Sequence, residues 1–546
     1  MPVSRRTSVV LGAVALALTL GACGGGDDGA AADGGNTVTV RGCNPQSPFV
    51  PANTNEVCGG DVLDQIFSFL VRYNPEDGQP ENEIAADIST EDSVTWTITL
   101  KDGWTFHDGT PVTSSSFVDA WNWAASGANA TLNSYFFEPI AGYAEVQGEV
   151  DDEGNYIDGS AAAETMSGLA VVDDLTFTVT LSQPESQFPM RLGYTAFAPL
   201  PQSFFEDPEA FGQHPIGTGP FQFDSWEPNI DIRISAYEDY AGDVKPSIDG
   251  ATYRIYENDD AAYNDLQADQ LDIMPLLPTS ALAGDTYKID LGERFVSRPT
   301  GVLETMTFAP SAVDSTYDEA GIRQAISMAI DRPLIVDKIF SGARIPANGW
   351  VSPVVPGFQD GACGTYCTYD AAAAKTLFDD SGGYDGTITI SYNSDSDHKA
   401  WVDAVCTSIT NALDVPCLGR GVVDLATFRD QITAREMGGV FRTGWQMDYP
   451  SLENFLVPVF ATGASANDGD YSNPDFDAAV KAAAANPDAE AAAAGYREAE
   501  QMLAADMPAI PLWNRVNIAG YSTHVENVQI TIFQTVDLLT VRTTTG

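Results

Sequence analysis

Two stretches of the chain alternate polar and large apolar residues with a period of two. Residues 92–100 and 174–181 place threonines between large apolar side chains. Because successive side chains of a strand point to opposite faces, this alternation predicts two half-buried strands with their hydroxyls outward. Between them, residues 113–125 repeat apolar side chains at helical spacing after a threonine suited to capping. We therefore expect a compact α/β insert at residues 81–208.

Strands and helices continue to alternate along the rest of the chain, without one fixed repeat. The same periodicity rules predict strands at 221–226, 230–236, 251–256 and 271–274, and helices at 260–270, 322–330 and 477–505. Asp331-Arg332-Pro333 ends one helix and begins another, and prolines at 474 and 487 interrupt the last, alanine-rich stretch. This order favours an α/β or α+β fold in several lobes.

The N-terminus has the features of an export signal. Two arginines precede an apolar stretch at 9–20, which is shorter than the roughly 20 residues that a membrane span requires. Leu-Gly-Ala-Cys follows, ends at Cys23 and resembles a bacterial lipobox, whose cysteine is acylated after cleavage. We expect residues 1–22 to be a signal peptide and the Gly/Ala/Asp-rich residues 23–36 to be a flexible tether. The mature protein would be extracytoplasmic and anchored to the cell membrane by its lipid.

The remaining cysteines fit an oxidising exterior. They form three couples of neighbours along the chain, Cys43 with Cys58, Cys363 with Cys367, and Cys406 with Cys417. We predict three local disulfides from this spacing. The Cys363-x-x-x-Cys367 couple is also compatible with half of a metal site, but the four histidines show no ligand spacing, which disfavours zinc. We expect no metal and no cofactor.

The charge balance excludes one class of partner. The formal net charge is −51, with 26 lysines and arginines against 77 acidic residues. Such a surface repels nucleic-acid phosphates, so we expect no DNA or RNA partner. The length is enough for more than one core, and we expect a monomer.

One short stretch carries opposite charges around an aromatic residue. Arg442, Trp445, Asp448 and Tyr449 lie within eight positions of one another. A free peptide has the complementary groups, a carboxylate at one end and an ammonium at the other, and a cleft that holds both charges apart would bind it at both ends. The alternative is a surface ion pair beside a core tryptophan.

Four blocks of sequence, in order, resemble one family. They are VTWTITLKDGWTFHDGTPV at 94–112, PIGTGPF at 215–221, IRQAISMAIDR at 322–332, and DYP at 448–450 followed by YSNPDFD at 471–477. Together they resemble the peptide- and nickel-type solute-binding proteins of ABC importers, extracellular solute-binding family 5. The Gly-Thr-Gly-Pro turn at 217–220 is not a phosphate loop, since it lacks the Lys-Ser/Thr ending.

The resemblance implies a hinged clamshell, an α/β fold of two periplasmic-binding-protein-like lobes (type II) with an extra subdomain. The first lobe would span 37–300. Its sheet domain would comprise 37–80, 209–300 and 516–546, with the inserted subdomain at 81–208. The second lobe would span 301–515.

The resemblance also implies residue roles and partners. Arg442 would bind the carboxylate of a short peptide and Asp448 its α-ammonium, with Trp445 and Tyr449 completing the ligand-binding set. Residues 446 and 447 are Gln and Met, so a disulfide that some relatives carry beside this motif is absent. The closed protein would dock on an ABC permease driven by ATPase subunits, near which the lipid at Cys23 would hold it.

Other functions compete with peptide capture. Family members of the same fold bind nickel chelates, haem or sugars, and a surface adhesion or sensory lipoprotein would need no importer. A secreted hydrolase is a further alternative, but the chain has no Gly-x-Ser-x-Gly elbow and no His-Glu-x-x-His helix. We expect that the protein is not an enzyme.

Overall fold

The computed structural model describes residues 36–75, 77–151, 156–256, 258–394, 396 and 398–544. Asn36–Gly546 form one compact unit. The predicted signal peptide at 1–22 and the acylation site at Cys23 lie outside the described residues. Within the described part, no helix is both long enough and apolar enough to span a bilayer.

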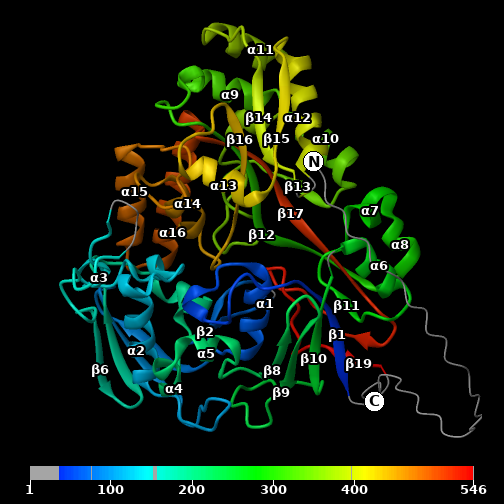
Figure 1. Ribbon diagram of the computed structural model, residues 1–546. Helices are drawn as coiled ribbons and strands as arrows, with labels where there is room; N and C mark the ends of the chain where they lie inside the picture. The colour runs from blue at the N-terminus through cyan, green and yellow to red at the C-terminus, as the bar shows by residue number, and fades with distance from the viewer. Residues whose placement is uncertain are drawn as a thin grey trace, which may run out of the picture. The chain divides into compact units, whose positions relative to one another are not determined.

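A large mixed sheet runs through the described residues, in the order β15-β14-β16-β12-β17-β11-β1-β10-β9-β8, with β13 paired to β17. Its strands are β1 (Thr37–Gly42), β8 (Phe221–Glu227), β9 (Asp231–Ala236), β10 (Gly250–Ile255), β11 (Ile273–Met274), β12 (Phe295–Phe308), β13 (Arg344–Pro346), β14 (Ile388–Asn393), β15 (Cys417–Val422), β16 (Val440–Gln446) and β17 (Ala509–Tyr521). The long strands β12 and β17 lie side by side (Figure 1) and pair from Phe295↔Gly520 to Thr307↔Ala509. They therefore join the two halves of the sheet.

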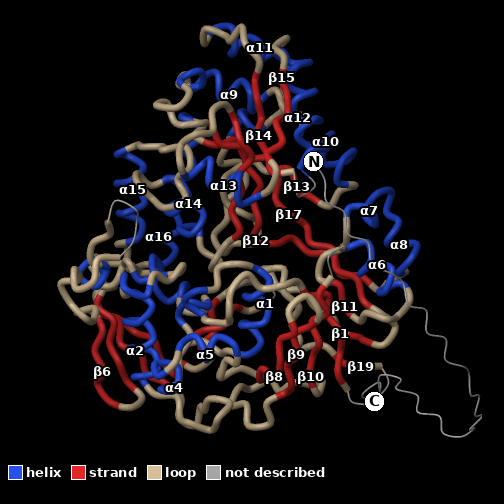
Figure 2. The backbone as a smooth tube through the Cα atoms, viewed as in Figure 1, coloured by secondary structure: helices blue, strands red, loops and turns tan. Residues whose placement is uncertain are grey.

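Smaller sheets complete the strand set. One has the order β4-β5-β7-β6, and the others pair β2 with β3 and β18 with β19. The bounds are β2 (Val71–Tyr73), β3 (Pro80–Asn82), β4 (Ala85–Thr90), β5 (Thr95–Leu100), β6 (Leu169–Asp173), β7 (Thr176–Thr180), β18 (Val525–Glu526) and β19 (Arg542–Thr543). The two alternating stretches are β5 and β7, which pair directly, and Figure 2 shows β6 of the same sheet near α2. Their apolar side chains are buried, as predicted: Phe177 stacks on Phe117 of α2 at 5.8 Å between ring centroids.

The helices predicted at 113–125, 260–270 and 322–330 and the one begun by Asp331-Arg332-Pro333 are present within a few residues, and the predicted 477–505 stretch forms two helices, α15 and α16. They are α1 (Val57–Ile66), α2 (Ser114–Ala125), α3 (Tyr143–Gln147), α4 (Gln202–Glu206), α5 (Pro208–Gln213), α6 (Asp259–Gln267), α7 (Thr279–Leu282), α8 (Thr286–Leu291), α9 (Ala320–Met328), α10 (Arg332–Phe340), α11 (Ala371–Asp380), α12 (His398–Leu413), α13 (Leu425–Thr433), α14 (Leu452–Phe460), α15 (Pro474–Ala484) and α16 (Ala489–Asp506). Single 3-10 turns are η1 (Pro51–Asn53), η2 (Gly127–Asn129), η3 (Ser134–Phe137), η4 (Phe188–Arg191), η5 (Thr195–Phe197), η6 (Ala283–Asp285), η7 (Ser315–Tyr317) and η8 (Gly364–Cys367). Thr113 and Ser116 form a capping box at the start of α2.

Two large hydrophobic clusters fill the interior. One gathers mainly residues between Val38 and Ile273 together with C-terminal residues up to Val541. The other gathers mainly residues between Leu303 and Trp513. The chain therefore returns to its first cluster after building the second.

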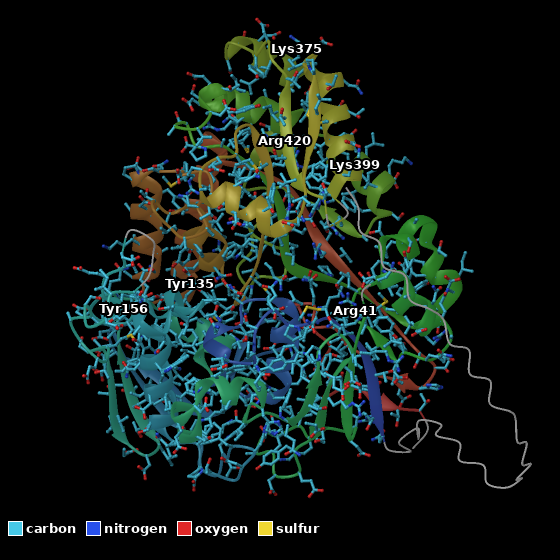
Figure 3. The ribbon with its side chains drawn as sticks, in the orientation of Figure 1. Arg41, Tyr135, Tyr156, Lys375, Lys399 and Arg420 are labelled. Atoms are coloured by element: carbon cyan, nitrogen blue, oxygen red, sulfur yellow. A yellow bond between two sulfur atoms is a disulfide. The ribbon has the colours of Figure 1, made fainter. Side chains whose placement is uncertain are left out.

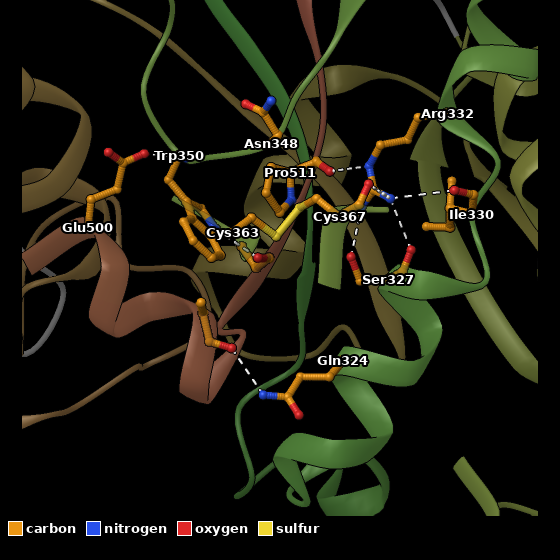
Figure 4. Close-up of a disulfide and its surroundings, with 12 residues drawn as sticks. Gln324, Ser327, Ile330, Arg332, Asn348, Trp350, Cys363, Cys367, Glu500 and Pro511 are labelled. Atoms are coloured by element: carbon orange, nitrogen blue, oxygen red, sulfur yellow. Dashed lines mark hydrogen bonds between the residues drawn. A yellow bond between two sulfur atoms is a disulfide. The ribbon is translucent and has the colours of Figure 1, made fainter. Parts of the chain in front are cut away.

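The predicted pairing of neighbouring cysteines is confirmed. Among the described residues, disulfides join Cys43 to Cys58, Cys363 to Cys367 and Cys406 to Cys417. Figure 4 shows the Cys363–Cys367 bond beside Arg332, which is 1% exposed. The Arg332 guanidinium donates to the carbonyls of Pro511 at 2.8 Å, Ser327 at 3.0 Å and Cys367 at 3.3 Å. Burial lowers the pKa of Arg332 to about 9.

His107 links two of the sequence blocks that carry the family resemblance. Its Nδ1 accepts a hydrogen bond from the Gly217 amide at 3.2 Å, and its Nε2 lies 3.1 Å from the Gly219 carbonyl oxygen. Burial lowers the pKa of His107 to about 4, so the ring is neutral at neutral pH and serves one acceptor and one donor role. These hydrogen bonds therefore join the 94–112 block to the 215–221 block.

Candidate functional site

Strand β16, which carries Arg442 and Trp445 of the predicted binding stretch, has one edge partly without a strand partner. It pairs with β12 along its length, from Val440↔Phe308 to Gln446↔Val302. On its other side it pairs with β14 at Val440 and Phe441 only, as far as the described residues show. The following residues up to Gln446 therefore present backbone groups to which an extended ligand can add as a strand.

Asp448 follows this edge and is held by α14. Its Oδ2 accepts a hydrogen bond from Nδ2 of Asn454 at 2.9 Å, and its backbone amide donates to Oδ1 of Asn454 at 2.9 Å. The indole nitrogen of Trp445 donates to the same Asn454 oxygen at 3.0 Å. One asparagine thus positions both the carboxylate and the indole that the sequence singled out.

The Asp448 carboxylate is desolvated and lacks a cationic partner. Burial raises its pKa to about 7, with Glu453 adding to the rise and Asn454 and Arg191 opposing it. Among the described residues, no lysine, arginine or histidine forms an ion pair with Asp448. A cationic ligand group would supply the missing charge.

Asp448 lines a cavity of about 210 Å³. Its other walls include Asp64 and Tyr73 and the C-terminal residues Ile532 and Phe533. The side chain of Asp64 is exposed to solvent in this cavity. Desolvation by the surrounding protein nevertheless raises its pKa to about 7, and a hydrogen bond from Thr195 opposes this rise. Glu83 and Asp537 line the same cavity, and burial raises their pKa values as well. The cavity therefore holds four carboxylates that burial disfavours when charged, together with the guanidinium of Arg72.

Arg442 lines a different cavity, of about 250 Å³. Its Nε donates to Oδ1 of Asn393 at 2.7 Å, and its guanidinium carbon lies 5.3 Å from the centroid of the Phe428 ring. Trp445 lines this cavity as well. The structure thus brings Trp445 to Asp448 through Asn454 and to Arg442 through a shared cavity, but it does not bring the two charged residues into one cavity.

Tyr449 lies outside both cavities. Its side chain is buried, its hydroxyl donates to Oε2 of Glu453 at 2.6 Å, and the Arg191 guanidinium lies 5.4 Å from its ring centroid. These contacts describe a residue packed inside the protein.

Sequence reasoning missed the buried ionic cluster around Tyr449. Arg191 pairs closely with Glu185 and lies 3.8 Å from Glu453, and all three side chains are buried. Ser451 also donates to Gln187 at 2.7 Å. These contacts join the segment ending in η4 to the start of α14, and residues so far apart in the chain leave no local pattern.

The comparisons with known proteins decide the family. Residues 79–467 match the model described as "Bacterial extracellular solute-binding proteins, family 5 Middle". The chain belongs to this family. This family 5 protein is 26% identical over 538 residues to the oligopeptide-binding protein OppA of Bacillus subtilis, covering 93% of this chain and 94% of that one. It is 26% identical over 514 residues to the periplasmic OppA of Haemophilus influenzae, covering 89% and 90%.

Solved structures agree with the family on the fold. The complex of Haemophilus influenzae OppA with the peptide RPPGFSPFR has a TM-score of 0.75 and 23% identity, covering 94% of this chain and 99% of that one. The Escherichia coli murein tripeptide binding protein MppA has a TM-score of 0.75 and 22% identity, covering 93% and 98%. The expected two-lobe α/β fold of periplasmic binding proteins is confirmed. The family is one of solute-binding proteins and not of enzymes, in agreement with the expectation from the sequence.

Proposed function

We propose that this family 5 protein captures short peptides and delivers them to an ABC permease. The observation that carries the proposal is Asp448, a desolvated carboxylate without an ion-pair partner among the described residues, which lines an open cavity beside a partly unpaired strand edge. An α-ammonium, with an ordinary pKa of about 7.7–8.0, is a cation of suitable size and charge for it. The relatives named for oligopeptide binding support this choice of ligand.

The rest of the ligand would lie along β16. Its backbone would pair with the edge that ends at Gln446, and Trp445 would form an apolar wall. Arg442 would receive the carboxylate of the longer peptides. Arg442 and Asp448 are six positions apart in the chain, which is at most about 20 Å of extended chain. With a contact of about 3 Å at each end, roughly four extended ligand residues fill this span.

Release and delivery would follow from the lobed fold. The proposed lobes are residues 37–300, together with the C-terminal return at 516–546, and residues 301–515. A ligand that contacts both lobes favours the closed form only by its differential contacts with them. The lipid proposed at Cys23 would keep the closed protein near the permease, whose ATPase subunits would supply the energy.

The test begins with the native ligand. Native mass spectrometry of protein purified without denaturation from exporting cells is expected to release a mixed set of short peptides. By calorimetry, Asp448→Asn is then expected to weaken the binding of a free-amine peptide about tenfold or more, and that of its N-acetylated form little. Asp102→Asn, an exposed turn carboxylate, controls for the loss of one negative charge. Equal loss for the free and acetylated peptides would exclude Asp448 as the amine anchor.

A further inference from the structure

The orientation of Asp448 depends on the first turn of α14. Asn454 lies in this turn, donates to the Asp448 carboxylate at 2.9 Å and accepts the Trp445 indole at 3.0 Å. Asn454 is 1% exposed, so its side chain can move only together with the backbone of the turn. A segment that fixes the start of α14 therefore also fixes Asp448.

A segment of the predicted insert that leads into η4 contacts this turn. Ser451 is the N-cap of α14, and its Oγ accepts from the Glu453 amide at 3.1 Å. The same hydroxyl donates to Oε1 of Gln187 in the insert at 2.7 Å. The Ser186 amide donates to the carbonyl of Ala484 in α15 at 2.9 Å. The insert is thus bonded both to the start of α14 and to its neighbour α15.

Arg191 adds a charged contact to the same turn. Its Nη2 pairs closely with Glu185 of the insert and lies 3.8 Å from Oε2 of Glu453. This Oε2 also accepts the hydroxyl of Tyr449 at 2.6 Å. One cation therefore lies between a carboxylate of the insert and a carboxylate of α14. Without this cation the two carboxylates would repel each other.

Such a cluster fixes an arrangement more than it adds stability. The side chains of Arg191, Glu185 and Glu453 are buried, with exposed fractions of 6% to 8%. Because desolvation offsets the attraction of buried charges, apolar side chains of similar size would often stabilise the contact equally well. Nε of Arg191 is moreover buried without a hydrogen-bond partner among the described residues. The charges instead specify which groups meet, and hence how α14 is oriented against the insert.

The insert also lies close to Asp448 itself. Gly193, two positions after Arg191, lines the same cavity as Asp448. Burial raises the pKa values of Tyr135 and Tyr194, and the charge of Asp448 adds to both rises. Burial likewise raises the pKa of Asp448, and the guanidinium of Arg191 opposes that rise. The charged cluster therefore acts on the charge of Asp448 as well as on its position.

We propose that Arg191 is a positioning residue for the amine anchor, through which the insert orients Asp448 toward the ammonium of a bound peptide. The inference rests on the proposed peptide function and on Asp448 as the group that binds the ammonium. Arg191 acts on Glu453, which directly precedes Asn454, and Asn454 holds the carboxylate. The alignment matters because a charged hydrogen bond weakens steeply when its angle or distance departs from the optimum.

The test measures the acetylation penalty, which is the ratio of the dissociation constants of acetyl-Ala-Ala-Ala and Ala-Ala-Ala, by calorimetry on the full protein. In the wild type this penalty is expected to be about tenfold or more. In Arg191→Met it should fall to about threefold or less, since a misaligned charged hydrogen bond contributes no more than a neutral one. A merely structural defect would lower the folded fraction and the affinity for both peptides alike, which leaves the ratio unchanged.

Two matched controls separate positioning from the loss of an arginine. Arg332→Met removes another buried arginine, but one that donates to backbone carbonyls elsewhere in the protein. Arg420→Met removes a positive charge from an exposed position on β15, which Figure 3 shows away from the insert. Both variants should keep the acetylation penalty of the wild type.

A second variant keeps the test decisive if Arg191→Met fails to fold. Gln187→Ala removes the neutral hydrogen bond to Ser451 without changing any charge, and it should lower the penalty about twofold or more. An undiminished penalty in Arg191→Met, or in Gln187→Ala where Arg191→Met does not fold, would overturn the positioning role. An equal fall in Arg332→Met would overturn it too. Absence of the penalty in the wild type would instead refute Asp448 as the amine anchor, and failure of every free peptide to bind would refute the proposed function.

Discussion

Replacing Asp448 by asparagine is expected to stabilise the ligand-free protein at pH 8 while weakening its peptide binding. The carboxylate is partly enclosed beside α14, and its hydrogen bond from Asn454 can be kept by the amide oxygen of an asparagine. The substitution therefore removes a desolvated charge without removing volume. A residue whose replacement stabilises the fold but impairs binding lowers the stability of the protein and is kept because of its function.

The magnitude follows from the pKa of Asp448, which burial raises from 3.8 to about 7. Unfolding returns this pKa to its ordinary value, so between pH 4 and pH 7 the folded state binds more protons than the unfolded state. Stability contributed by the protonated carboxyl is therefore present below about pH 4 and is lost as the pH rises to about 7. About three pKa units correspond to roughly 4 kcal/mol, which is an upper limit because the side chain is partly open to the cavity.

The assay is urea unfolding at pH 4 and pH 8. Asp448→Asn is expected to raise the free energy of unfolding by up to about 4 kcal/mol at pH 8 and by well under 1 kcal/mol at pH 4. Asp102→Asn, which removes an exposed carboxylate from a turn, corrects for the change in overall charge. If Asp448→Asn shifted stability equally at both pH values, or lowered it at pH 8, the reading of Asp448 as a desolvated, unpaired carboxylate would be refuted.

Three further substitutions test the scaffold. Arg332→Met should lower the free energy of unfolding by about 3 kcal/mol or more in urea, since it leaves buried carbonyls without donors; an unchanged midpoint would contradict this. Removing the Cys406–Cys417 disulfide with two serines opens a loop with a sequence separation of 11, and calorimetry should show a loss of roughly 3 kcal/mol. Gly217→Ala places a Cβ 1.8 Å from the Ile66 carbonyl oxygen, so thermal unfolding should show a loss of about 3 kcal/mol, and retention of the wild-type midpoint would refute the close approach.

Local patterns explain how much of the fold was predictable. The threonine alternation of β5 and β7 and the capped start of α2 are visible in a few consecutive residues, and both predictions are confirmed. The disulfides were predictable for the same reason, because each joins neighbours in sequence. The pairing of β12 with β17 links segments about two hundred residues apart, and no local periodicity records such a pairing.

The residues of the candidate site were likewise predictable only where they lie close together in the sequence. Asp448 and Trp445 could be singled out because they lie in one short stretch, and the structure joins them through Asn454. Arg191 was missed because one of its partners, Glu453, lies in a distant part of the chain. Such a charge pair becomes visible only after folding brings its two residues together.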